Sequence, residues 1–289
     1  MLEWLSEPFA LGFQQRALVG GVLAGVMASV VGTWLVLRGM SFFGDAFVHG
    51  VVPGIAAAVV LDFSPFLGAA VAAAVMVGGI LLVHRQTALK EDTAIGLLFV
   101  GMLALGVVII SRSSSYAGSL TSILFGDALG VTREALLGQA LLATVVVAAA
   151  VLLYRPLLAL SFDATKAQAL GMRPGLTNAV LLVLIAAAVI GSYQSVGTLL
   201  VFGLLVGPPA TAALLARTVP TMMGIAVVVA VFSVTAGLVI SYYAGTAASA
   251  TMAIVPIVLF FVTLAITRGA ARLRRRAERP AATHADVTS

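Results

Sequence analysis

Long apolar runs with almost no charge between them constrain this chain more than any other feature of its sequence. Charged residues make up 9% of the 289 residues and hydrophobic residues make up 61%, whereas about a quarter of the residues in a soluble domain are charged. A membrane-spanning helix needs about 20 consecutive, predominantly apolar residues. The sequence therefore predicts an all-α polytopic membrane protein, a bundle of about eight to nine transmembrane helices.

The charged residues and turn signals between the apolar runs give the boundaries of the predicted spans. Each run is 16 to 24 residues long, enough to cross a bilayer with some tilt or local thinning. The predicted spans are Ala17–Leu37, Ala46–Leu61, Phe66–Val83, Ala94–Ser111, Ala135–Tyr154, Leu176–Tyr193, Gly197–Ala216, Val219–Tyr242 and Ala248–Thr267. We expect an interfacial segment over residues 1–16, a single transmembrane domain over 17–267, and a basic cytoplasmic tail over 268–289.

Basic residues in the loops predict the orientation of the chain, because cytoplasmic loops of membrane proteins carry an excess of Lys and Arg. Four of the segments between or after the predicted spans are basic, and counting back from a cytoplasmic tail puts all four on one side. The C-terminus is therefore predicted to be cytoplasmic, and nine spans would leave the N-terminus outside. The basic residues are Arg85 and Lys90; Arg155, Lys166 and Arg173; Arg217; and the tail from Arg268 onward.

Several chemistries are excluded by residues that the sequence lacks. The chain has no cysteine, so disulfides, thiolate metal sites and iron–sulfur clusters are excluded. A P-loop needs Gly-Lys-Ser/Thr, but Lys90 follows Leu89 and Lys166 follows Thr165. The zinc-protease and serine-hydrolase motifs are also missing, and the net charge of +5 is no signature of nucleic-acid binding. The sequence thus favours neither an enzyme nor a nucleic-acid partner.

Asp45 and His49 are an ionisable pair at the start of the second predicted span, in the stretch Gly44-Asp45-Ala46-Phe47-Val48-His49-Gly50. Their spacing of four residues places both on the same helix face, and ionisable groups within a membrane are functional candidates by default. A carboxylate with an imidazole suits Zn²⁺, and Mn²⁺ also tolerates this ligand set. Alternatively, Asp45 caps a helix and His49 makes an interhelical hydrogen bond. The residues alone leave both readings open.

Prolines within the predicted spans indicate helix breaks. Pro53 follows the ionisable pair, and Pro208 and Pro209 stand in the middle of the seventh span. Freed backbone carbonyls are tolerated in a membrane only where protein or a cavity satisfies them, and broken helices often frame transport sites. We therefore expect interruptions at Pro53, Pro208 and Pro209, near a pathway or as plain structural kinks.

Two further patterns concern helix contacts and docking. Gly21, Gly25 and Ser29 repeat every fourth residue, the small-residue spacing that allows helices to approach closely. The loop over residues 155–175 contains a short amphipathic helix that follows Phe162 and ends at Gly171. Such a helix lies on the membrane or docks into another protein.

Taken together, stretches in order over nearly the whole chain resemble one family, the membrane permeases of bacterial metal-type ABC importers. These importers move zinc, manganese or iron(II) with the help of a solute-binding protein. The matching stretches are Arg38–Ala46 with His49 and Pro53–Gly54; Glu91–Gly96; Leu124–Asp127; Phe162–Gly171; Val196–Gly197; Pro209–Ala212; and Gly237–Tyr242. The chain departs from the expected pattern at Val48, at Gly50 and in the double proline after Gly207.

The resemblance implies partners and roles that composition does not show. It implies a homodimeric permease in the bacterial cell (inner) membrane, with an extracytoplasmic solute-binding protein and separate cytoplasmic ABC ATPase subunits that hydrolyse ATP. Asp45 and His49 would contact the ion in transit by alternating access, with Zn²⁺ expected before Mn²⁺ and no covalently bound cofactor. The coupling helix would dock into the ATPase, and its residues would include Phe162, Asp163, Ala167, Leu170 and Gly171.

Other functions remain open on the sequence alone. The nearest alternative is an ABC permease for a metal chelate of the siderophore or cobalamin type, which would need a wider pathway. A proton-coupled secondary transporter would need more buried acidic groups than this chain offers. A multi-pass membrane enzyme would use Asp45 and His49 as acid and base and would act without a partner subunit.

Overall fold

The structure, a computed structural model, describes residues 7–87, 91–111, 131–162, 164–169 and 171–277. In this part of the chain all regular secondary structure is helical, and eight helices are long and apolar enough to cross a membrane. The predicted all-α polytopic fold with about eight to nine transmembrane helices is therefore confirmed. The long elements are α2 (Gly12–Leu37), α3 with α4 (Ser41–Gly50 and Val52–Val60), α5 (Pro65–Gln86), α6 (Glu91–Ile110), α8 (Arg133–Leu152), α11 (Pro174–Ala213), α12 (Val219–Ala244) and α13 (Ala248–Ala277).

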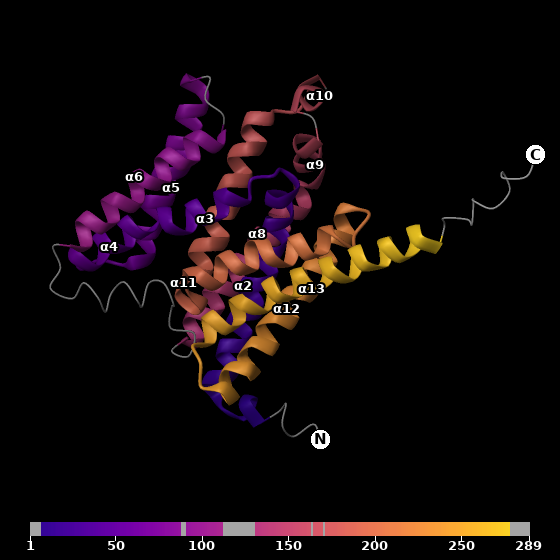
Figure 1. Cartoon of the computed structure of the whole chain (residues 1–289). Helices are drawn as coiled ribbons and strands as arrows, with labels where there is room; N and C mark the ends of the chain where they lie inside the picture. Colours follow the sequence, from indigo (N-terminus) through magenta and orange to yellow (C-terminus); the bar gives the residue numbers. More distant parts are fainter. Residues whose placement is uncertain (1–6, 88–90, 112–130, 163, 170, 278–289) are drawn as a thin grey trace, which may run out of the picture.

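Three short helices lie outside these spans: η1 (Glu7–Ala10), α9 (Tyr154–Phe162) and α10 (Ala164–Ala169). Figure 1 shows α3, α4, α5 and α6 grouped on one side of the molecule, and α2, α8, α11, α12 and α13 forming the rest of the bundle. The first group packs on the second mainly through α3 and α5 against α11. The first long helix begins at Gly12, earlier than the predicted boundary after residue 16, and η1 is a separate turn.

Helix α2 is the most buried of the spans and contacts α12 through its small residues. A Cβ atom on Gly21 would lie 2.7 Å from a methyl group of Val234. About two helical turns further, the Ser29 hydroxyl donates a hydrogen bond to the Ala226 carbonyl at 3.3 Å. The sequence numbers run in opposite directions, so α2 and α12 are antiparallel. The close helix contact predicted for Gly21, Gly25 and Ser29 is confirmed.

Contacts at the C-terminal end of α2 define one end of the bundle, which we call the Arg38 end. The guanidinium of Arg38 donates a hydrogen bond to the side-chain oxygen of Asn178, near the start of α11. The Trp34 ring packs edge-on against Tyr154, the first residue of α9, with ring centroids 5.6 Å apart. The C-terminal end of α2, the start of α9 and the start of α11 therefore lie together.

Helix α11 reverses direction within its length. Its start lies at the Arg38 end, and the start of α12 lies there too, because Leu37 and Val219 line the same pocket. Within Pro174–Ala213 the residue with a non-helical backbone is Gly197, with φ 77° and ψ 161°. The chain therefore crosses as Pro174–Tyr193, turns at Gly197 and returns as the shorter apolar helix Leu199–Ala213.

This reversal lies between the sixth and seventh predicted spans, Leu176–Tyr193 and Gly197–Ala216, as the apolar runs indicate. The returning helix continues through Pro208 and Pro209 with a helical backbone, so the interruption expected at these two prolines is not present. In the second span, α3 ends at Gly50 and α4 begins at Val52, with Pro53 in the first turn of α4. There the helix is interrupted next to the predicted proline.

Candidate metal-binding site

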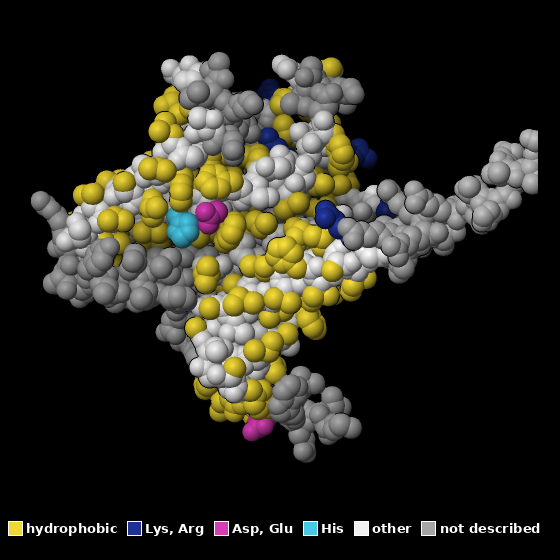
Figure 2. Space-filling model, viewed as in Figure 1, with side chains coloured by type: hydrophobic (Ala, Val, Ile, Leu, Met, Phe, Trp, Pro, Cys, Tyr) yellow, Lys and Arg dark blue, Asp and Glu magenta, His cyan; other side chains and the backbone are white. Residues whose placement is uncertain are grey.

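Helix α3 holds Asp45 and His49 side by side. The Nε2 atom of His49 lies 3.5 Å from the Oδ1 atom of Asp45, and the side chains are 31% and 32% exposed respectively. The opposite face of α3 is anchored by Phe43 and Phe47, both fully buried. Figure 2 shows a histidine next to an acidic side chain at the surface, with hydrophobic side chains around them. The helix thus buries its aromatic face and leaves an ionisable pair accessible.

The separation of the pair suits two ligands of one ion. Two atoms that each lie about 2.1 Å from a tetrahedral metal are about 3.4 Å apart, close to the observed 3.5 Å. A direct hydrogen bond between the two groups would bring them to about 2.7–3.2 Å. Among the described residues no group of three or more His, Cys, Asp or Glu side chains is placed to hold a metal. One copy of the chain therefore supplies two such ligands at this point.

The structural alternative for Asp45 does not fit its position. Helix α3 begins at Ser41, its N-cap position is Met40, and no side chain caps that end. Asp45 therefore lies inside the helix and does not cap it. The His49 ring packs against Phe99 of α6, with ring centroids 6.1 Å apart. Sequence reasoning missed Phe99, because a phenylalanine in an apolar span carries no signal of its own.

The predicted coupling region is a helix pair at the Arg38 end. Helix α9 ends at Phe162, whose side chain is 76% exposed. Helix α10 follows, with Ala167 buried, and ends before Gly171, which has a φ of +76°. The short helix predicted to end at Gly171 is thus present. The other two predicted coupling residues, Asp163 and Leu170, lie outside the described residues.

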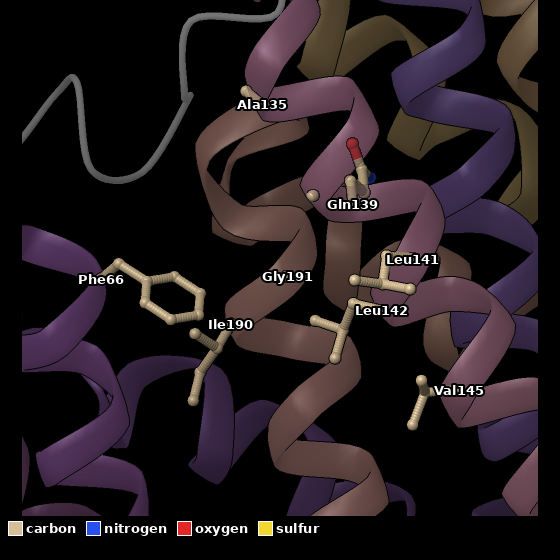
Figure 3. A pocket seen from close by; sticks show the side chains of 9 residues that line it. Phe66, Ala135, Gln139, Leu141, Leu142, Val145, Ile190 and Gly191 are labelled. Atoms are coloured by element: carbon tan, nitrogen blue, oxygen red, sulfur yellow. The ribbon is translucent and has the colours of Figure 1, made fainter.

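A cavity elsewhere in the bundle is apolar and separate from the pair. It has a volume of about 440 Å³ and lies between the start of α5, α8 and α11 (Figure 3). Its lining includes Phe66, Leu142 and Ile190, together with Gln139. The Gln139 amide nitrogen donates a hydrogen bond to the Gly20 carbonyl of α2 at 3.0 Å. Neither Asp45 nor His49 lines this cavity.

Comparisons with known proteins agree with the resemblance seen in the motifs. The model of the ABC-3 family, described as the ABC 3 transport family, matches residues 10–267. The manganese transport system membrane protein MntC of Listeria innocua is 34% identical over 87% of this chain and 89% of its own length. The chelated iron transport system membrane protein YfeD of Yersinia pestis is 32% identical over 91% of this chain and 89% of its own length.

A solved structure extends the agreement to the fold. The structure described as PsaBC from Streptococcus pneumoniae in complex with Fab has a TM-score of 0.80 and 31% identity, and the match covers 90% of this chain and 94% of that chain. The region matched by the family model contains the Asp45–His49 pair, both interrupted spans and the α9–α10 region. This chain therefore belongs to the ABC 3 transport family and is the permease of a metal-type ABC importer.

Proposed function

We propose that this permease forms the ion pathway of an importer for divalent transition metals and that Asp45 and His49 bind the ion in transit. The observation that carries the proposal is their position. Two ionisable side chains lie on one face of a membrane-spanning helix and are about one-third exposed. Such groups are costly next to lipid, so they face either a water-filled pathway or another protein surface.

A second copy of the chain completes the metal site in this proposal. One copy offers a carboxylate oxygen and an imidazole nitrogen, whereas zinc sites take four ligands and manganese commonly takes six. A two-fold axis beside α3 would bring two such pairs together, because a two-fold interface uses the same surface of both subunits. Two pairs supply four ligands, and water fills any remaining positions, so the ion can also leave.

Manganese is the cargo that the relatives favour, since MntC is named as a manganese transport protein and YfeD as a chelated-iron transport protein. The ligand chemistry of the pair also suits zinc, which the sequence alone placed first. Cells select among such metals partly by availability, because the intrinsic affinities follow a common order. The proposal is therefore Mn²⁺ import, with Zn²⁺ as the competing ion that an uptake experiment must rank.

Energy for transport comes from separate ATPase subunits, and a solute-binding protein supplies the ion at the opposite membrane face. Arg38, Arg155, Arg173 and Arg217 lie at or next to the contacts that define the Arg38 end, and an excess of Arg marks a cytoplasmic face. The exposed Phe162 and the helix α10 lie at that same end. We assign them as the contact through which ATP binding switches the pathway between outward and inward access.

The test is uptake by the permease reconstituted in liposomes with its ATPase and its metal-loaded binding protein. Wild type, His49→Ala and Asp45→Asn are compared for ATP-dependent uptake of Mn²⁺, Zn²⁺ and Fe²⁺. Asp62→Asn is the matched control, since Asp62 is an exposed carboxylate in the turn after α4 with a φ of 55° that asparagine tolerates well. Both pair variants should lose uptake while the complex still assembles, and the control should transport normally. Normal uptake by both pair variants would remove the pair from the pathway.

A further inference from the structure

An aromatic side chain from a neighbouring helix packs on the face of α3 that carries the ionisable pair. Phe42, Asp45 and His49 share this face, because they follow one another at three- and four-residue spacings. Phe99 of α6 lies between the two rings of that face. Its ring centroid is 5.9 Å from that of Phe42, with an interplanar angle of 79°, and 6.1 Å from that of His49, with an angle of 57°.

A histidine that binds a metal needs a second contact that holds its ring in the right orientation. In most metal sites the second ring nitrogen donates a hydrogen bond to a carboxylate, a backbone carbonyl or water, and this contact sets the orientation of the ring. Among the described residues, the His49 ring approaches Asp45 at 3.5 Å and packs against Phe99. Aromatic packing against Phe99 is therefore one of the two contacts that can orient the ring.

We propose that Phe99 is a positioning residue for His49 and contributes to the metal specificity of the permease. The proposal rests on the function proposed above for Asp45 and His49. The Phe99 ring keeps the imidazole turned so that Nε2 and the Asp45 oxygen bind the same ion. The ring also covers one side of the pair with an apolar surface, so an ion must shed water to bind there. Mg²⁺ loses its bound water reluctantly. The apolar surface of Phe99 therefore favours softer transition metals over Mg²⁺.

The experiment measures Mn²⁺ binding to the purified permease–ATPase complex by electron paramagnetic resonance of the free ion, with and without excess Mg²⁺. Phe99→Leu keeps apolar volume but removes the flat ring, and Phe99→Tyr keeps the ring. Phe232→Leu is the matched control, because Phe232 is an exposed phenylalanine of α12. We expect Phe99→Leu to weaken Mn²⁺ binding on the order of tenfold, as for other residues that orient a ligand, and to make binding more sensitive to Mg²⁺.

Phe99→Tyr and Phe232→Leu should bind Mn²⁺ as the wild type does, and all three variants should keep the wild-type melting temperature. Wild-type binding by Phe99→Leu would overturn the proposal. So would an equal loss in Phe99→Tyr, or a loss that follows a lowered melting temperature, because either result indicates a general packing role. His49→Ala separates the two proposals. If it binds Mn²⁺ normally, the proposed function itself fails, whereas if it loses binding and Phe99→Leu does not, only the positioning role fails.

Discussion

The two interrupted membrane spans of this protein are broken by different means. In the second span the helix is interrupted at Val51, between α3 and α4. Val51 keeps a helical backbone, with φ −85° and ψ −13°, and Pro53 lies in the first turn of α4. In α11 the break is Gly197, with φ 77° and ψ 161°. The first break leaves Ser41–Val60 a single 20-residue span, whereas the second sends the chain back towards the end it came from.

The difference shows that a proline alone does not turn a membrane helix. Proline removes one backbone donor but keeps a φ compatible with a helix, so the chain can continue in the same direction. A positive φ is adopted mainly by glycine, and at Gly197 it reverses the direction of the chain. The polar pair before the first break therefore stays on a continuous span, while the second break creates a short returning helix.

Pro208 and Pro209 show how a membrane helix accommodates proline without a break. The carbonyl of Leu205 would normally accept the hydrogen bond from the residue at position 209, but proline has no N–H to donate. That carbonyl instead lies directly against Gly32 of α2, where a Cβ atom would be only 1.9 Å from its oxygen. Neighbouring helices can satisfy freed backbone groups in this way, and a Cα–H···O contact is a weak substitute for the lost hydrogen bond.

The largest effect is expected for Gly32→Ala. The new methyl group would overlap the Leu205 carbonyl oxygen at 1.9 Å and would also approach Pro209 at 3.1 Å, so α2 and α11 must separate. Overpacking of this kind costs about 1–3 kcal/mol and occasionally more, and here the obstacle is backbone that cannot rotate away. The readout is the yield of monodisperse protein in detergent and its melting temperature. Gly101→Ala in α6 is the control, because nothing lies within 4 Å of its Cβ position. A wild-type melting temperature for Gly32→Ala would contradict the account of the proline pair.

The next largest effect is expected for Gly197→Ala. An L-residue at a φ of 77° is strained by about 1–2 kcal/mol, and the strain falls on the residue that reverses α11. We expect a lower melting temperature and reduced assembly with the ATPase. Gly175→Ala, in the first turn of the same helix with open space around its Cβ position, should leave both unchanged. Equal behaviour of the two variants would mean that the turn does not require glycine.

Much of this fold is predictable from the sequence because its signals are local. Apolar run length predicts the spans, and four-residue spacing predicts both the small-residue contact of Gly21 with α12 and the shared face of Asp45 and His49. The turn in α11 was predicted as the gap between the sixth and seventh spans, where Gln194 and Ser195 interrupt the apolar run just before Gly197. The interruption expected at Pro208 and Pro209 was not found, because the returning helix continues through both residues.

The remaining features depend on neighbours that are distant in the sequence. Whether Pro209 breaks its helix depends on Gly32, which stands in another helix and offers room to the Leu205 carbonyl. In the same way, the ring that packs on His49 comes from α6, and no pattern within α6 marks Phe99. Tertiary contacts of this kind cannot be deduced from periodicity, because they depend on which helices become neighbours.

A smaller effect on stability is expected for Pro53→Ala. The substitution restores a backbone donor in the first turn of α4, where the first N–H groups of a helix have no intrahelical partner, so the free energy of unfolding should change by less than about 1 kcal/mol. Metal uptake should be affected more than the free energy of unfolding. The interruption at Val51 sets the angle between α3, which carries Asp45 and His49, and the tightly packed α4. There, a Cβ atom on Gly54 would lie 2.0 Å from the Gly68 carbonyl oxygen of α5. Unchanged uptake would make the first break a purely structural feature.

The smallest effect is expected for Pro208→Ala, and it sharpens the comparison most directly. Helix α11 already continues through this residue, so alanine only restores one donor to the Leu204 carbonyl. A gain in helix propensity and the loss of the rigid ring from the unfolded chain oppose each other. We therefore expect a change in melting temperature close to zero and wild-type uptake. A clear loss of uptake with an intact fold would show that Pro208 acts in transport although it does not break its helix. Pro208 would then have the kind of role in transport that is expected for Pro53.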